Sequence, residues 1–196
     1  MHAFDRRDLA GYRIVVRTAK EGEKLVTLDE QELTLTESNL LICDGEKPVG
    51  LAGIMGGLNS EIKDTTTAVV FEAAKFARDN IRRSARALGK RTDASAHFEK
   101  GTDEYTVELA MKRALYLTEE LGAGTVTDEC AGKNTGNSIE KRPLTVSLAR
   151  VNGVLGIEVP GEAVCRILAN LDMEPELEDD VLRLKIPAYR EDMESY

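Results

Sequence analysis

A glycine-rich segment between two apolar runs constrains this chain more than any other feature. Ala52-Gly53-Ile54-Met55-Gly56-Gly57 follows the apolar residues Val49–Leu51, and Glu72 comes directly after the next apolar run, 68–71. Residues without a Cβ let a ligand come close to backbone N–H groups. Such a segment is most often a turn. Followed by an isolated carboxylate, it also predicts one wall of a pocket.

A second segment of small residues lies further along the chain. Thr92-Asp93-Ala94-Ser95 comes shortly after Gly89, a typical helix stop, and is followed by His97-Phe98-Glu99-Lys100-Gly101. Small hydroxyl and methyl side chains leave volume that a ligand can fill. The alternative is an ordinary turn between a helix and a loop.

The hydrophobic pattern of the first 131 residues predicts strands and then helices. Short apolar runs separated by turn residues predict a meander or barrel, with strands at 14–16, 25–28, 32–35 and 40–42. A further strand is predicted at 68–71, with Glu72 at its end. Helices are predicted from about Asp79 to Leu88 and from an N-cap at Asp103 to a stop at Gly122. An apolar stripe predicts that the second helix packs on the sheet; its members are Val107, Ala110, Met111, Ala114, Leu117 and Leu121.

A polar segment without periodicity predicts a linker at 132–142, between domains at 1–131 and 143–196. The second domain has a strand pattern at 144–148, short helices around 150–155 and 164–171, and a hairpin through 178–180. This order predicts a small winged-helix-like unit. Its second helix holds only Arg166 against two acids, so we expect a scaffolding role rather than nucleic-acid reading. The predicted fold class is α+β: a partly open, mainly antiparallel β-barrel or sheet layered with helices, followed by this small α+β domain.

Composition limits the classes of function. The 196 residues are 42% hydrophobic, and no apolar run approaches the roughly 20 residues that span a bilayer, so we expect a cytoplasmic protein without a membrane partner. Cys43, Cys130 and Cys165 are far apart and lack zinc-site spacing, so no metal site is predicted. A net charge of −9 argues against a nucleic-acid-binding surface over the whole chain.

One stretch departs from this acidic balance. Between Lys75 and Arg91 seven basic residues stand against Asp79 alone. At helical spacing Arg78, Arg82 and Arg86 share one face, which would be open to phosphates. The alternative is the solvated face of an ordinary amphipathic helix.

Several motifs recur in this order in one family: His2-Ala3-Phe4-Asp5, 52–57, Phe71-Glu72, 92–95 and 98–101. On these residues the chain resembles the bacterial phenylalanyl-tRNA synthetase beta subunit. The resemblance covers the B3/B4 editing domain up to about Ala131 and the start of the B5 domain from about Arg142. It implies that the chain is a fragment of a longer subunit, with both domains truncated.

The resemblance implies an activity and its residues. This region of the family hydrolyses tyrosine wrongly attached to the phenylalanine tRNA, because a synthetic pocket rejects an added hydroxyl only weakly. By resemblance Glu72 recognises the tyrosine phenol, Thr92 and Ala94 line the pocket, and Gly53, Gly56 and Gly57 form a wall whose amides could hold the ester or a water. His2 would lie near the ribose and position water, although at the start of the chain little is expected to fix its ring. The role of His97 is left open, because the family more usually has a basic residue there.

The resemblance also implies partners and cofactors. The parent enzyme attaches phenylalanine to its tRNA with ATP and Mg²⁺ on a module outside this chain, so no cofactor is expected here. The phenylalanine tRNA and the synthetase alpha subunit are the expected partners, in an α2β2 assembly. Two alternatives stay open: a non-catalytic RNA-binding and assembly module with an incomplete pocket, and, less well supported by the glycine spacing, a phosphate cradle of a nucleotide-binding domain.

Overall fold

The computed structural model describes residues 1–127, 130–132, 140–190 and 192–193. The chain divides into two compact units: one holds Met1–Thr102 and Thr106–Cys130, and the other runs from Ala131 onward and includes Asp103–Tyr105. Most of the predicted linker, 133–139, lies outside the described residues, so the predicted domain boundaries remain predictions.

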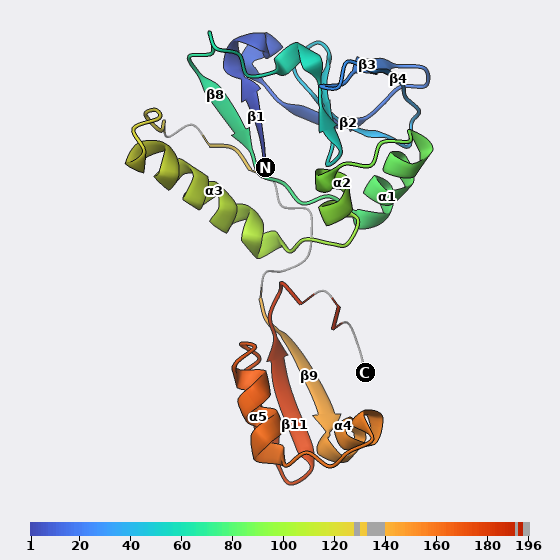
Figure 1. Ribbon diagram of the computed structural model, residues 1–196, viewed down its shortest axis with the longest axis vertical. Helices are drawn as coiled ribbons and strands as arrows, with labels where there is room; N and C mark the ends of the chain where they lie inside the picture. Colours follow the sequence, from blue (N-terminus) through green and yellow to red (C-terminus); the bar gives the residue numbers. More distant parts are fainter. Residues whose placement is uncertain (128–129, 133–139, 191, 194–196) are drawn as a thin grey trace. The chain divides into compact units, whose positions relative to one another are not determined.

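The first unit is built from small antiparallel sheets (Figure 1). A four-stranded sheet has the order β2-β5-β6-β7, β3 pairs with β4, and β1 pairs with β8. The strands are β1 (His2–Asp5), β2 (Val15–Thr18), β3 (Lys24–Val26), β4 (Glu32–Thr34), β5 (Leu40–Cys43), β6 (Pro48–Leu51), β7 (Met55–Gly56) and β8 (Val69–Glu72). The described strands form open sheets and no closed barrel, as the α+β prediction allowed. Short 3-10 turns occur at Arg6–Asp8, Ala10–Tyr12 and Leu58–Ser60.

A glycine sets the end of the first helix in this unit. Helix α1 (Arg78–Ala87) ends where Gly89 takes a φ of 63°, and the N–H of Lys90 donates to the C=O of Ala85. This is a Schellman arrangement, and it confirms the helix stop predicted at Gly89. Helix α2 (Asp93–Phe98) begins directly afterwards and packs against α1.

Helix α3 (Glu104–Glu120) forms where the apolar stripe predicted it and is followed by Gly122 with a φ of 63°. None of its residues, all of which the structure describes, is fully buried, and Leu121 just beyond it is 75% exposed. Apolar side chains such as Leu109 and Tyr116 lie outside the predicted stripe and are exposed. The predicted stripe is therefore the partly buried side of the helix, although no residue of the helix is fully buried.

The core of the first unit joins the sheets to α1. Phe4, Leu35, Leu41, Val49 and Ile81 are almost completely inaccessible to solvent. Leu41 and Val49 belong to β5 and β6, and the last three residues of each of these strands are buried. Leu35 follows β4 directly, and Ile81 reaches the same core from α1.

The second unit follows the predicted order of strand, two helices and hairpin. Strand β9 (Arg142–Ser147) is followed by α4 (Leu148–Leu155), α5 (Gly161–Ala169), β10 (Glu176–Glu178) and β11 (Val181–Ile186). The sheet order is β10-β11-β9, and Glu178 pairs with Val181 across the predicted turn. Met173, Leu182 and Ile186 form the centre of a separate core.

Candidate functional site

Strands β1 and β8 bring two of the predicted site residues together. They pair antiparallel, with His2 opposite Glu72 and Ala3 opposite Phe71. Directly opposed residues of an antiparallel pair project from the same face with their Cβ atoms about 5 Å apart. The imidazole of His2 and the carboxylate of Glu72 therefore belong to one face, although 70 positions separate them.

The ring of His2 is held in place, contrary to our expectation. It meets the ring of Phe4 edge to face at a centroid distance of 4.6 Å. It also lies directly over Gly56: a Cβ built on Gly56 would be 2.6 Å from Nε2 of His2. Burial lowers the pKa of His2, which favours the neutral form of the imidazole. The expectation was wrong because the pairing of β1 with β8 and the missing Cβ of Gly56 fix the ring. Neither can be read from the residues next to His2.

Glu72 ends β8, as the sequence predicted, and is partly buried. Burial raises the pKa of its carboxyl group. Within the part of the chain that the structure describes, the carboxylate makes no hydrogen bond or ion pair. A desolvated carboxylate of this kind gains from any hydroxyl that donates to it.

The glycines have structural roles that differ from one another. Gly53 has a φ of 66° in the turn closed by the N–H of Ile54 donating to the C=O of Leu51 at 3.1 Å. A Cβ on Gly53 would be 2.8 Å from the side chains of Phe76 and Ile81. The N–H of Gly57 donates to the C=O of Val49 at 2.8 Å, so this amide is already engaged. Of the glycine wall, Gly56 is the member that contacts a predicted site residue directly.

Thr92 joins the glycine turn to α2. Its Oγ1 accepts from the N–H of Ser95 at 3.1 Å and donates to the C=O of Ile54 at 2.8 Å. The hydroxyl of Ser95 in turn accepts from the N–H of Thr92, which completes a capping box. Ala94 lies on the exposed surface of α2. The predicted residues thus come from four segments that contact one another, but Thr92 is committed to a helix cap.

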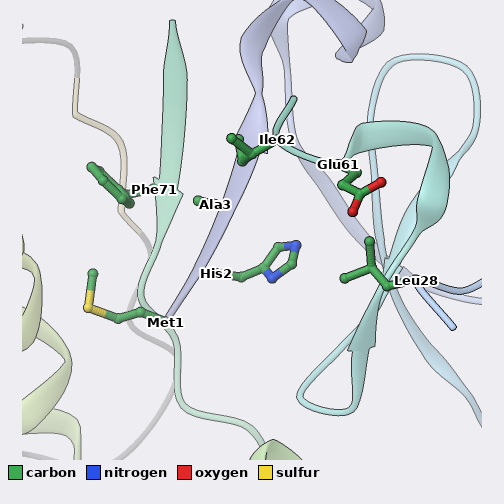
Figure 2. Close-up of a pocket in the computed structure, with 7 residues that line it drawn as sticks. All are labelled: Met1, His2, Ala3, Leu28, Glu61, Ile62 and Phe71. Carbon is green, nitrogen blue, oxygen red and sulfur yellow. The ribbon is translucent and has the colours of Figure 1, made fainter. Parts of the chain in front are cut away.

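A cavity of about 450 Å³ lies beside β1 (Figure 2). It is lined by Met1, His2, Ala3, Leu28, Glu61, Ile62 and Phe71. Figure 2 shows the ring of His2 between Leu28 and the strand, with the carboxylate of Glu61 on the same side. His2 is the predicted site residue among these lining residues; Glu72, Thr92, Ala94 and the three glycines are not among them.

Sequence reasoning missed Leu28, Glu61 and Phe71 as cavity residues. Leu28 was assigned to a strand, Phe71 only to a motif, and Glu61 follows a short turn without any pattern. The resemblance could have drawn attention to Phe71, since it precedes Glu72. No local pattern marks Leu28 or Glu61 as a cavity residue.

The predicted basic residues are on α1 and its surroundings. Arg78, Arg82 and Arg86 are exposed on this helix, as predicted. In the described ranges, with their gaps at 128–129, 133–139, 191 and 194–196, no group of three or more His, Cys, Asp or Glu could hold a metal ion. No described helix is long and apolar enough to cross a membrane.

Comparison with known proteins identifies the family. Residues 1–123 match the family model of the B3/4 domain. The chain belongs to the B3/4 domain family. Beyond this B3/4 domain, residues 144–196 match the tRNA synthetase B5 domain.

Two relatives of this B3/4 domain chain carry the same name. It is 42% identical over 193 residues to the phenylalanine–tRNA ligase beta subunit of Clostridium tetani, and 43% identical over 204 residues to that of Syntrophus aciditrophicus. Each match covers 98% of this chain and 24% of the relative, so the chain spans about a quarter of their length. These matches confirm the resemblance to the bacterial phenylalanyl-tRNA synthetase beta subunit.

One solved structure is also similar. An N-terminal fragment of the phenylalanyl-tRNA synthetase beta-subunit from Pyrococcus horikoshii matches with a TM-score of 0.44 at 16% identity, over 97% of this chain and 55% of that chain. A likeness at this level carries no functional argument.

Proposed function

We propose that the B3/4 domain of this chain hydrolyses tyrosyl-tRNA(Phe), as the editing part of a phenylalanyl-tRNA synthetase beta subunit. The observation that carries the proposal is the pairing of His2 with Glu72 on one face, with the ring of His2 packed over Gly56. This places a neutral imidazole and an unpaired carboxylate beside backbone that lacks a side chain. A polar aromatic substrate could contact the imidazole and the carboxylate, while Gly56 is buried beneath the ring and leaves room for it.

Glu72 is the specificity group in this proposal. The tyrosine hydroxyl donates to the carboxylate, and a hydrogen bond to a charged group contributes about 1.5–3 kcal/mol. Phenylalanine leaves the same carboxylate desolvated and unpaired, as it is in the free chain. The site therefore favours the amino acid with the additional hydroxyl, which is the error that a synthetic site rejects poorly.

The chemical step needs only water and the ester. The oxygen of a water attacks the carbonyl carbon, the bond to the ribose oxygen breaks, and free tyrosine and the tRNA hydroxyl are released. A neutral imidazole at His2 accepts a hydrogen bond from this water and orients it. An aminoacyl ester is activated enough that a nucleophilic side chain is not required.

The remainder of the proposal concerns the parent protein. By family membership it would attach phenylalanine to its tRNA with ATP and Mg²⁺, assemble with an alpha subunit as α2β2, and act in the cytoplasm. The corresponding relatives are named as beta subunits of a ligase. That chemistry would lie outside this chain.

A second candidate function is a non-catalytic RNA-binding and assembly module. It is favoured by the hydroxyl of Thr92, which is occupied by the helix cap, and by the position of Glu72 outside the lining of the 450 Å³ cavity. Such a module would contact tRNA without releasing an amino acid.

The deciding experiment is hydrolysis of purified tyrosyl-tRNA and phenylalanyl-tRNA by the chain and three variants. We expect faster release of tyrosine than of phenylalanine, and we expect Glu72→Ala to lose this preference. Ala94→Trp tests whether a bulky side chain at this exposed position of α2 blocks the substrate, as the family resemblance implies. Glu21→Ala removes an exposed carboxylate in the same unit and should behave as wild type. Equal release of both amino acids, or release unaffected by Glu72→Ala, would refute the proposal. No release by the folded chain would favour the second candidate.

A further inference from the structure

A small hollow lies on the exposed side of α1. It has a volume of about 280 Å³ and is lined by Asp79, Arg82, Arg83 and Arg86. All four side chains are exposed. Three guanidinium groups thus converge on one depression in a chain whose net charge is −9.

The structure separates these arginines from the other basic residues of the segment. Lys90 is 6% exposed; its ammonium pairs with Asp29 and donates to Gln31 Oε1 at 2.7 Å. Arg91 lies 3.8 Å from the carboxylate of Glu99. Lys90 and Arg91, which belong to the basic stretch 75–91, are therefore already paired with acids.

The arginines that line the hollow have few partners of their own. Nε of Arg83 donates to the backbone C=O of Asp79 at 3.3 Å. In the described part of the chain, Arg82 and Arg86 make no hydrogen bond or ion pair. They are four residues apart on one helix, where like charges repel. An anion in the hollow would remove this repulsion.

Phosphate is the anion that this arrangement fits best. The planar guanidinium donates two parallel N–H bonds to a pair of phosphate oxygens, and several such forks can hold a chain of phosphates. A basic depression in an acidic chain also concentrates the electrostatic attraction for a polyanion at one place. The hollow is thus suited to a nucleic-acid backbone.

Contacts that lead from α1 to the candidate site favour RNA over an acidic protein as the ligand. Helix α1 packs against α2, and Thr92, the cap of α2, bonds to the glycine turn of the site. We propose that Arg82, Arg83 and Arg86 bind backbone phosphates of the RNA whose 3′ end carries the ester. This inference rests on the proposed function, because it takes the RNA part of the same substrate as its ligand.

The test measures binding of deacylated phenylalanine tRNA to the full chain by fluorescence anisotropy over a range of salt concentrations. Arg82→Glu/Arg86→Glu should weaken binding at least about tenfold at low salt and reduce the salt slope by about two. Arg82→Lys/Arg86→Lys keeps the charges and loses the forks, so its affinity should be intermediate. Arg13→Glu/Lys20→Glu makes the same charge change at exposed positions elsewhere in the unit and should bind nearly as wild type.

Several outcomes would overturn the proposal. They are no measurable binding by the folded wild-type chain at low salt, an unchanged affinity in Arg82→Glu/Arg86→Glu, and an equal loss in Arg13→Glu/Lys20→Glu. Tighter binding of a polyglutamate peptide than of tRNA at this face would instead identify an acidic protein partner. Deacylated tRNA carries no ester, so the measured binding of tRNA does not depend on whether the chain hydrolyses tyrosyl-tRNA.

Discussion

The ring of His2 occupies the space that a side chain at Gly56 would need, which gives a prediction at the scale of single residues. A Cβ on Gly56 would be 2.5 Å from Cε1 of His2, whereas a Cβ on its strand partner Gly50 would make only ordinary contacts at 3.7 Å or more. Gly56→Ala should therefore lower the free energy of unfolding by about 1–3 kcal/mol, as overpacking does. Gly50→Ala should lower the free energy of unfolding by less. Chemical denaturation of both variants provides the comparison.

A double variant tests the cause. In His2→Ala/Gly56→Ala the ring is gone, so the added methyl group has space, and the two effects should not add. The double variant should then be less destabilised than the sum of the single variants. Strict additivity would mean that the ring of His2 does not lie over Gly56.

At the scale of elements, one hydroxyl fixes the short helix α2 to the glycine turn. Thr92 Oγ1 both caps the helix and donates to the C=O of Ile54. Thr92→Val keeps the shape but loses both bonds, and should lower the free energy of unfolding by about 1–2 kcal/mol. Thr92→Ser keeps the hydroxyl and should be much closer to wild type. Similar losses in Val and Ser variants would show that packing of the methyl group, not the hydroxyl, is responsible.

At the scale of the whole molecule, carboxyl groups with opposite shifts should shape the pH dependence of stability. Burial of Asp44 opposes ionisation, but hydrogen bonds from the Lys47 side chain and from the amides of Lys47, Glu46 and Ala10 outweigh it and lower its pKa to about 2. A lowered pKa stabilises the fold above the unfolded pKa of about 4, and this stabilisation is lost as the pH falls towards 2. Glu72 has the opposite sign: its raised pKa costs stability as the pH rises above about 4.5.

Thermal unfolding between about pH 2 and pH 8 would check both signs in one series. Asp44→Asn should unfold at a lower temperature than wild type at pH 7, with the difference vanishing near pH 2. Glu72→Gln should unfold at a higher temperature than wild type at pH 7, with no difference below about pH 4. Differences that do not change with pH would mean that neither carboxyl group titrates differently in the folded chain.

Local patterns predicted the elements well where the chain itself supplies the reason. Alternating apolar residues gave the short strands, Gly89 and Gly122 gave the helix ends, and the two acids at 179–180 gave the last hairpin. Each of these depends on residues within one turn of the feature. The apolar stripe predicted helix α3 but not that none of its residues is fully buried. Burial depends on the residues that other segments place against the helix.

The sequence by itself determined the α+β class, the order of elements in the second unit and, through its motifs, the family; in the first unit it did not predict β1, β6, β7 or α2. Tertiary structure alone decided how the site is assembled: that His2 lies opposite Glu72 and over Gly56, that the hydroxyl of Thr92 is used in a cap, and that Lys90 is buried against Asp29. The physical reason is the separation along the sequence of the residues that determine each feature. Backbone conformation follows from neighbouring residues. Strand register, close contact and the pairing of charges join residues roughly 40–70 positions apart and appear only when the chain has folded.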